Sequence, residues 1–513
     1  MLDKNKENLV ESKRLSEALK ALKNSQNKNQ GAIESKDLTE QQRLLLLETG
    51  FIRSVMKGWY VCSNPSDHDG DSTAWHANYW AFIAGYLGKR FGKRYCLNAE
   101  ASLLLHTGST TVPRQITVIT QDGGTSILKL PFDTSLVLYQ DEQRISKTRT
   151  EFKGVQVLPL SEALCAIGPQ FFISHPTEVE IALAMIRDPS ELLAILLLDK
   201  CLPTAASRLA GALAFTKRND DAERIIKSLA RAGYPITAKN PFVLTEPSIS
   251  QSREKSPYVL RIKSMWAKWR DDVIANFPKA PGLPTTSTAY LKQIDDRYIT
   301  DAYNSLSIEG YQVTDELIER IAHAGWNPDI SAEDKKSQDV LAARGYFLAF
   351  KEVKESIKLI LEKDNPGEVI RKNHHDWYAS MFNPAVLAGI LQSHQLAGYR
   401  TGPVFIRNSL HTPLPREALL DSMETLFDLL ATEPEASVRA VLGHHLFVFI
   451  HPYFDGNGRI GRFLMNALLA SGGYPWTIIR LSERERYMSA LERASVDGDI
   501  KPFTQFLAGE MTQ

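Results

Sequence analysis

The sequence has no long apolar run, few cysteines and no excess charge of either sign. Its longest apolar run, 192–198, ends at Asp199 and is far too short to cross a bilayer, which takes about 20 residues. The 60 basic and 60 acidic residues cancel, so no global field points to nucleic acid or to a membrane partner. The amino terminus lacks the apolar segment of a signal peptide. The 4 cysteines are widely spaced and show no metal-ligand pairing, which favours free thiols in a reducing cytoplasm: Cys62, Cys96, Cys165 and Cys201.

The length of 513 residues suggests two to four domains. Hydrophobic residues make up 43% and charged residues 23%, which is ordinary for a globular protein. Helical periodicity dominates the second half, where it predicts helices over 332–361, 385–391 and 436–450, whereas the first half mixes helical segments with strand-like ones such as 115–120. The stretch between them is broken by prolines and serines. We therefore expect a multidomain chain with a polar segment, an α+β region, a linker and an all-α region: 1–30, 31–235, 236–257 and 258–513.

The most informative stretch is 451–462, His-Pro-Tyr-Phe-Asp-Gly-Asn-Gly-Arg-Ile-Gly-Arg. Gly456 and Gly458 let the backbone bend and approach a ligand, and Asn457 between them tolerates a left-handed conformation. A helix is expected to follow over 460–469. Successive N–H groups at such a turn form an anion nest, and the helix dipole also favours phosphate there. The turn alone is most often just a turn, so the charged residues around it decide its interpretation.

Those charged residues suit a magnesium-bound polyphosphate. Arg459 and Arg462 are three positions apart, so they share one helix face and can reach neighbouring phosphates. Asp455 is a hard oxygen ligand for Mg²⁺ that bridges phosphates. His451, with an ordinary pKa near neutrality, is a natural general base. Together these residues predict transfer of a phosphorus-containing group to an acceptor that must lose a proton.

This stretch resembles the signature of Fic proteins, His-x-Phe-x-[Asp/Glu]-Gly-Asn-Gly-Arg-x-x-Arg, with Tyr453 in place of Phe. The added hydroxyl needs a partner. The resemblance implies an all-α Fic fold and transfer of AMP from ATP, with Mg²⁺, to a Ser, Thr or Tyr hydroxyl of a target protein or of the chain itself. Carried over by position, His451 would deprotonate the hydroxyl and Asp455 would hold Mg²⁺. The following residues would bind ATP: Gly456, Asn457 and Gly458 the α- and β-phosphates, Arg459 the β-phosphate and Arg462 the γ-phosphate.

Two other segments match the same family. Residues 398–407 resemble the Fic flap, a small β-hairpin that aligns the target segment by main-chain pairing, and its target-facing residues would be Val404, Phe405 and Ile406. Residues 305–310, Ser-Leu-Ser-Ile-Glu-Gly, fit the inhibitory motif [Ser/Thr]-x-x-x-Glu-[Gly/Asn]. In that family the glutamate, here Glu309, pairs with the second signature arginine and prevents the γ-phosphate from seating. We therefore expect an autoinhibited adenylyltransferase. The alternative is that Glu309 only ends a helix.

The region before the linker indicates a second kind of module. Thr39 is a plausible N-cap for a helix that Gly50 ends, and two short strands, 51–55 and 58–62, follow. A helix and a small hairpin suggest a winged helix-turn-helix. Residues 31–235 diffusely resemble AbiEi-type antitoxins of type IV toxin–antitoxin systems, which implies DNA as a partner. The basic residues available for DNA are Arg43, Lys57, Lys89, Arg90, Lys93 and Arg94.

Three alternatives to the autoinhibited adenylyltransferase stay open at this point. The chain could be a DNA-binding regulator with a sensory Fic domain. It could transfer another nucleotide, or remove AMP by hydrolysis with Glu309 orienting water. The sequence names neither the target protein nor the oligomeric state.

Overall fold

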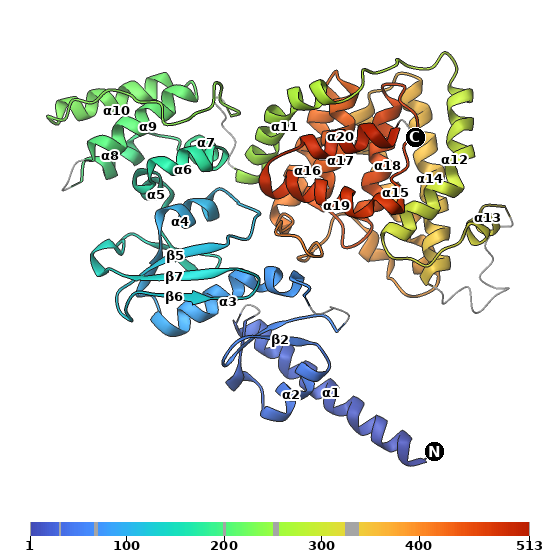
Figure 1. Cartoon of the computed structure of the whole chain (residues 1–513), viewed down its shortest axis with the longest axis horizontal. Helices are drawn as coiled ribbons and strands as arrows, with labels where there is room; N and C mark the ends of the chain where they lie inside the picture. The colour runs from blue at the N-terminus through green and yellow to red at the C-terminus, as the bar shows by residue number, and fades with distance from the viewer. Residues whose placement is uncertain are drawn as a thin grey trace. The chain divides into compact units, whose positions relative to one another are not determined.

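The computed structural model describes residues 2–29, 32–65, 70–198, 202–249, 256–323 and 338–511. They form two compact units (Figure 1). Unit 1 is Met1–Pro257 with Phe405–Thr412, and unit 2 is Tyr258–Val404 with Pro413–Gln513. Cys201 lies outside the described residues, as do the first residues of a helix expected over 332–361.

Unit 1 begins with helices around a three-stranded antiparallel sheet of order β1-β3-β2. Thr39 caps α2 as predicted, because its hydroxyl accepts from the Gln42 N–H while the Gln42 side chain accepts from the Thr39 N–H. Gly50 follows α2 at φ +75°, a left-handed conformation that suits glycine. The elements are α1 Leu2–Asn29, β1 Ala32–Glu34, η1 Ser35–Asp37, α2 Glu40–Glu48, β2 Ile52–Met56 and β3 Trp59–Cys62.

The rest of unit 1 contains a four-stranded sheet of order β4-β5-β7-β6, a two-stranded sheet and a group of helices. Strands β5 and β7 pair in parallel and bury alternate residues, such as Val118 and Leu136. The elements are α3 Thr73–Phe91, β4 Tyr95–Leu97, α4 Ala99–His106, β5 Gln115–Thr120, β6 Ser126–Lys129, β7 Ser135–Gln140, η2 Glu142–Arg144, β8 Thr150–Phe152, β9 Val155–Val157, α5 Leu160–Ala166, α6 Pro169–Ser174, α7 Pro176–Met185, α8 Ser190–Leu196, α9 Pro203–Phe215 and α10 Asn219–Arg231.

A short segment from late in the sequence, Phe405–Thr412, completes unit 1. Arg407 forms an ion pair of 3.0 Å with the buried Asp71. The Thr412 N–H donates to the Thr110 carbonyl over 2.7 Å. The segment after Val404 is therefore held by residues that precede it by roughly three hundred positions.

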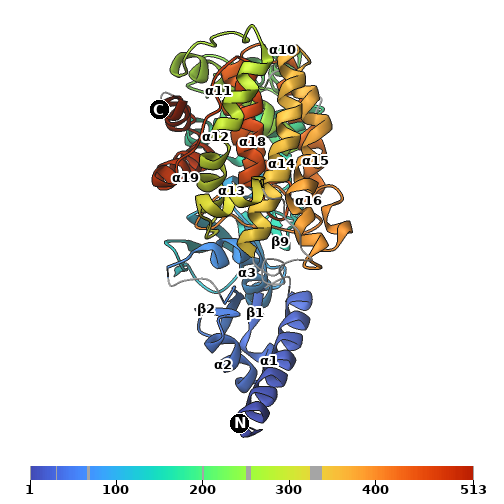
Figure 2. The same ribbon diagram turned by 90° about the vertical axis from the view of Figure 1, so that its right-hand side faces the viewer.

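The described residues of unit 2 form α-helices and short 3-10 and π turns that are joined by loops, and they contain no strand (Figure 2). The long helices α14 and α15 pack side by side, as Figure 2 shows. The elements are α11 Pro257–Asn276, α12 Ser287–Ile308, α13 Asp315–His323, α14 Gln338–Leu361, α15 Pro366–Leu387, η3 Ser393–Leu396, α16 Arg416–Thr432, α17 Ala436–Ile450, α18 Asn457–Ala470, η4 Leu481–Glu483, α19 Arg484–Glu492, η5 Arg493–Asp497 and α20 Lys501–Met511.

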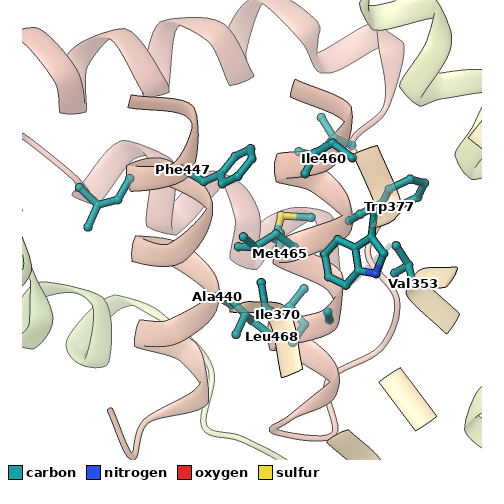
Figure 3. Close-up of a cluster of buried hydrophobic side chains, with 14 of the residues drawn as sticks. Val353, Ile370, Trp377, Ala440, Phe447, Ile460, Met465 and Leu468 are labelled. Carbon is teal, nitrogen blue, oxygen red and sulfur yellow. The ribbon is translucent and has the colours of Figure 1, made fainter. Parts of the chain in front are cut away.

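Helix α18, which carries the second half of the signature, lies at the centre of unit 2. It contacts α12, α14, α15 and α17, and nearly all of its side chains are buried. Figure 3 shows Met465 and Leu468 of α18 in one cluster with Phe447 of α17 and Trp377 of α15. Because α18 is packed on all sides, its N-terminus and the two arginines of its first turns have a fixed place in the core.

The structure differs from the sequence-based expectations in two places in unit 2. Residues 398–407, expected as a β-hairpin, contain no strand; Pro403 has no N–H to donate, and the segment is divided between the units after Val404. A helix expected over 385–391 is the end of α15, which runs through Pro384 and stops at Leu387. Tertiary packing keeps α15 continuous through Pro384, so no separate helix begins after it.

Among the described residues, no helix is both long and apolar enough to cross a membrane.

Candidate active site

His451 directly follows α17 and has a left-handed backbone, with φ 57° and ψ 61°. Its Nδ1 lies 3.0 Å from the Val448 carbonyl. Because a carbonyl oxygen only accepts, Nδ1 carries the proton and the lone pair is on Nε2. Burial lowers the pKa of His451 to about 4. At neutral pH the imidazole is therefore uncharged and able to accept a proton through Nε2.

The turn after His451 starts helix α18. Gly456 is its N-cap, with a left-handed φ of 78°. The Asn457 side chain is buried and bonds twice to Tyr453: it accepts from the backbone N–H over 2.9 Å and donates to the carbonyl over 2.8 Å. Its amide therefore holds the turn in shape, and its backbone N–H is available to contact an anion. The backbone N–H groups of Asn457 and Gly458 lie in the first turn of α18, where helix N–H groups lack intrahelical partners.

Arg459 projects from that first turn and is 2% exposed. One of its nitrogens lies 3.3 Å from Oδ1 of Asp455, whose side chain is 65% exposed. The same Oδ1 accepts from the Gly456 N–H over 2.6 Å. Among the described residues, no group of three or more metal-ligating side chains occurs. A Mg²⁺ ion at Asp455 would therefore need its remaining ligands from phosphates and water, which is the usual way that nucleotide-bound Mg²⁺ is held.

Arg462 is one turn further along α18 and is bound by residues of α12. It donates from Nη2 to Oε1 of Glu309 over 2.7 Å. It also donates to the Ser305 hydroxyl over 2.8 Å and to the Ser305 carbonyl over 2.9 Å. Burial acts to lower the pKa of Arg462, but the Glu309 carboxylate reverses this and raises it. Partial burial acts to raise the pKa of Glu309, but the charges of Arg462 and Arg459 outweigh it and lower that pKa.

The Glu309 carboxylate also lies over the first turn of α18. A Cβ placed on Gly458 would come within 2.4 Å of Oε1 of Glu309. Only a glycine leaves room for the carboxylate at this point of the helix N-terminus. Glu309 therefore contacts both groups that the sequence assigns to phosphate: the guanidinium of Arg462 and the first turn of α18.

Arg400 connects the segment 398–407, which was expected to form the flap, to His451. It is 3% exposed, and its guanidinium donates only to backbone carbonyls: to His451 over 2.7 Å, to Gly402 over 2.9 Å and to Leu414. Its own N–H donates to the Pro452 carbonyl over 2.9 Å. Burial lowers the pKa of Arg400 to about 10, so it stays charged at neutral pH.

The sequence-predicted residues fall into two groups. The structure brings together His451, Asp455, Gly456, Asn457, Gly458, Arg459, Arg462 and Glu309 in unit 2. The predicted flap residues are divided, because Val404 belongs to unit 2 whereas Phe405 and Ile406 belong to unit 1.

Tyr453 finds the hydroxyl partner that the sequence required. Its hydroxyl lies 2.9 Å from Nδ1 of His375. Its ring stacks on Tyr378, with centroids 3.8 Å apart and an interplanar angle of 6°. Both partners are on α15, in a stretch that the sequence pattern did not mark as part of the site. Only the unsatisfied hydroxyl of Tyr453 signalled that such a partner must exist.

The comparisons with known proteins match the same region. The Fic/DOC family matches residues 369–469, which confirms that the chain contains a Fic domain. A protein adenylyltransferase Fic of Nematostella vectensis is 28% identical over 252 residues, 48% of this chain and 55% of that protein. Another, of Drosophila willistoni, is 37% identical over 131 residues, 23% of this chain and 26% of that protein. The chain thus spans about half or less of these relatives. A solved structure of Fic-1 from C. elegans is 18% identical, covering 65% of this chain and 84% of that one, with a TM-score of 0.36.

Proposed function

We propose that the chain is a protein adenylyltransferase that transfers AMP from ATP to a hydroxyl group of a target protein, and that Glu309 inhibits it. The observation that carries this proposal is the carboxylate of Glu309, which bonds to Arg462 over 2.7 Å at the same helix N-terminus that His451 precedes. A carboxylate there competes with phosphate for one guanidinium. The named activity of the Fic relatives supports the choice of AMP as the transferred group.

The chemistry follows from the groups in place. The hydroxyl oxygen of the target forms a bond to the α-phosphorus of ATP, and the bond from that phosphorus to the bridging oxygen breaks. The hydroxyl proton goes to Nε2 of His451, and pyrophosphate leaves. The N–H groups of the first turn of α18, with Arg459 and Arg462, bind the phosphates and stabilise the charge that moves to the leaving group. Mg²⁺ at Asp455 would supply further charge stabilisation.

The first test compares the parent chain with Glu309→Gly and with the neutral isostere Glu309→Gln. Each is incubated with labelled ATP, GTP, UTP or CTP, and self-modification is measured by intact mass. Removing the carboxylate frees Arg462, and couplings of this kind are typically about 5- to 150-fold. We expect self-AMPylation to rise within that range in both variants. The exposed Glu319 on the neighbouring helix α13 offers a matched control, because Glu319→Gln should leave the rate of the parent unchanged.

The double variant Glu309→Gly with Arg462→Ala should lose the gain, since Arg462 is the group that Glu309 releases. Equal rates in the parent and in Glu309→Gly would leave Glu309 as a helix-end residue only. Modification with a nucleotide other than ATP would replace AMP as the transferred group. A Glu309→Gly chain that loses an AMP-removing activity would instead assign hydrolysis to this site.

A second proposal, independent of the first, concerns unit 1. We propose that residues 32–62 form a winged-helix module that contacts DNA. The β1-β3-β2 strand order, with α2 between β1 and β2, is the observation that favours it.

A further inference from the structure

Arg459 is in contact with two aromatic rings that the signature does not contain. Its guanidinium carbon lies 5.1 Å from the ring centroid of Tyr311 and 5.3 Å from that of Phe382. With 2% exposure, the guanidinium is removed from water. Its one ion pair in the described structure is the 3.3 Å contact with the mostly exposed Asp455. The two rings are therefore the main buried surroundings of this cation.

Aromatic rings suit a guanidinium that must bind phosphate. The faces of the rings attract the cation electrostatically. The planar guanidinium presents its N–H donors at its edges, in the geometry that phosphate oxygens accept. The ring faces therefore orient the guanidinium, and the Tyr311 hydroxyl adds a side-chain hydrogen bond to Arg459. A carboxylate in the same place would orient Arg459 too, but it would compete with the phosphate, as Glu309 does at Arg462.

The two rings come from different parts of unit 2. Phe382 is on α15 and also packs under the anion-binding turn, because a Cβ on Gly456 would come within 2.8 Å of its ring. Tyr311 comes two residues after Glu309, in the segment that leaves α12. One ring is thus part of the helical scaffold, and the other belongs to the inhibitory turn.

The end of α12 fixes Tyr311 and Glu309 together. Gly310 has φ +94°, its N–H donates to the Ser307 carbonyl over 3.0 Å, and the Tyr311 N–H donates to the Leu306 carbonyl over 3.2 Å. These bonds make a Schellman motif, in which a left-handed glycine ends the helix. The glycine after the inhibitory glutamate therefore has a structural reason. It turns the chain so that Glu309 reaches Arg462 while Tyr311 reaches Arg459.

We propose that Tyr311 is a positioning residue that holds Arg459 ready for the β-phosphate of the nucleotide. This inference rests on the proposed nucleotide-binding function and deepens it. The turn after α12 then has two opposite effects: Glu309 blocks the γ-phosphate arginine, and Tyr311 prepares the β-phosphate arginine. Activation must therefore move the Glu309 side chain while the turn stays in place, because displacement of the whole turn would remove one ring from Arg459.

The test uses the full chain carrying Glu309→Gly, with Tyr311→Ala or Tyr311→Phe added, and measures the binding of ADP and of AMP by calorimetry. AMP has no β-phosphate, so its affinity reports on the rest of the pocket. We expect Tyr311→Ala to weaken ADP about 3- to 30-fold, the range of a desolvated cation–π contact, and to leave AMP unchanged. Tyr311→Phe keeps the ring but loses the hydroxyl that bonds to Arg459, so it should weaken ADP binding less than Tyr311→Ala does. The KM for ATP should rise in parallel with the loss of ADP affinity.

A half-buried tyrosine on α12 itself serves as the control, and Tyr303→Ala should leave both affinities unchanged. Equal losses for ADP and AMP would make Tyr311 a general packing residue and overturn the inference. Unchanged ADP binding, or faster self-modification in Tyr311→Ala, would overturn it as well. If the Glu309→Gly chain binds neither nucleotide, the proposed function itself fails, which is a different outcome from a chain that binds both but ignores Tyr311.

Discussion

Two arginines of unit 2 and two lysines of unit 1 lie in opposite environments. In unit 2 the side chains of Arg459 and Arg462 are 2% and 4% exposed. In unit 1, Lys36 and Lys89 are 64% and 49% exposed, and both pair with Glu34. The ammonium groups of both lysines therefore stay in contact with water, although the side chain of their shared partner Glu34 is only 11% exposed. Lys36 and Lys89 are thus ordinary surface cations.

A buried cation is a different case. Removal of one partner from a buried ion pair typically costs about 3–5 kcal/mol, because the other charge is left without water or a counter-ion. Arg462 therefore gains from a counter-ion, and Glu309 supplies one in this structure. The difference between these residues is what the proposed function requires, because a guanidinium kept out of water beside a helix N-terminus could exchange a carboxylate for a phosphate.

The largest effect that would test this contrast is expected at His451. The variant His451→Ala removes the proton acceptor but leaves the arginines and the first turn of α18 in place. In the Glu309→Gly chain, we expect nucleotide binding to be retained and transfer to fall by about 10²–10⁴-fold, the usual contribution of a general base. Calorimetry with ATP and self-modification by intact mass measure the two quantities separately. Comparable transfer in the variant would remove His451 from its role.

A smaller effect is expected in the pH profile. A general base works in its uncharged form, which predominates above its pKa. Burial lowers the pKa of His451 to about 4, so the fall in activity on the acid side should move down from the ordinary value near 6.5. We expect the rate of the Glu309→Gly chain under saturating ATP to stay level from about pH 8 to about pH 5.5. A tenfold loss between about pH 7 and pH 5.5 would mean that the imidazole titrates in its ordinary range.

The sequence could predict those parts of the site that are adjacent in the chain or belong to a known pattern. Thr39 as a cap, the strand 115–120 and the helix 436–450 follow from local rules, and the structure has them at the expected residues. The contact between Glu309 and Arg462 joins residues 153 positions apart, and only the family motif made it predictable. The adenylyltransferase roles of the individual residues stay predictions.

Other features depend on tertiary packing, which no local pattern carries. The ring of Tyr311 over Arg459 requires the exit of α12 and the start of α18 to meet. The partner of Tyr453 lies on α15, 78 positions away. The flap segment was expected to form a hairpin from its own sequence, but the hydrogen bonds of Phe405–Thr412 go to residues of unit 1 near Asp71 and Thr110. Local propensity cannot show that a neighbouring unit will take these bonds.

The smallest effect is expected for DNA binding by unit 1. Several of the basic side chains that the sequence offered for phosphate already have protein partners: Arg43 donates to the Ser35 carbonyl, Lys89 pairs with Glu34, and Arg94 pairs with Asp122. Lys57, in the turn between β2 and β3, is exposed and is the best candidate for a phosphate contact.

With few such cations, we expect the full chain to shift duplex DNA weakly at about 50 mM salt and not at about 200 mM, because each phosphate contact makes binding salt-dependent. Lys57→Ala should flatten the slope of log K against log salt by about 0.9, the value for one contact. The exposed Lys351 on α14 in unit 2 offers the matched control, and Lys351→Ala should leave the slope unchanged. No shift at low salt would remove the DNA-binding proposal. A tight complex that survives physiological salt would mean that unit 1 rearranges its ion pairs and frees more cations for phosphate. The contrast between the lysines of unit 1 and the arginines of unit 2 would then hold only for the chain without DNA.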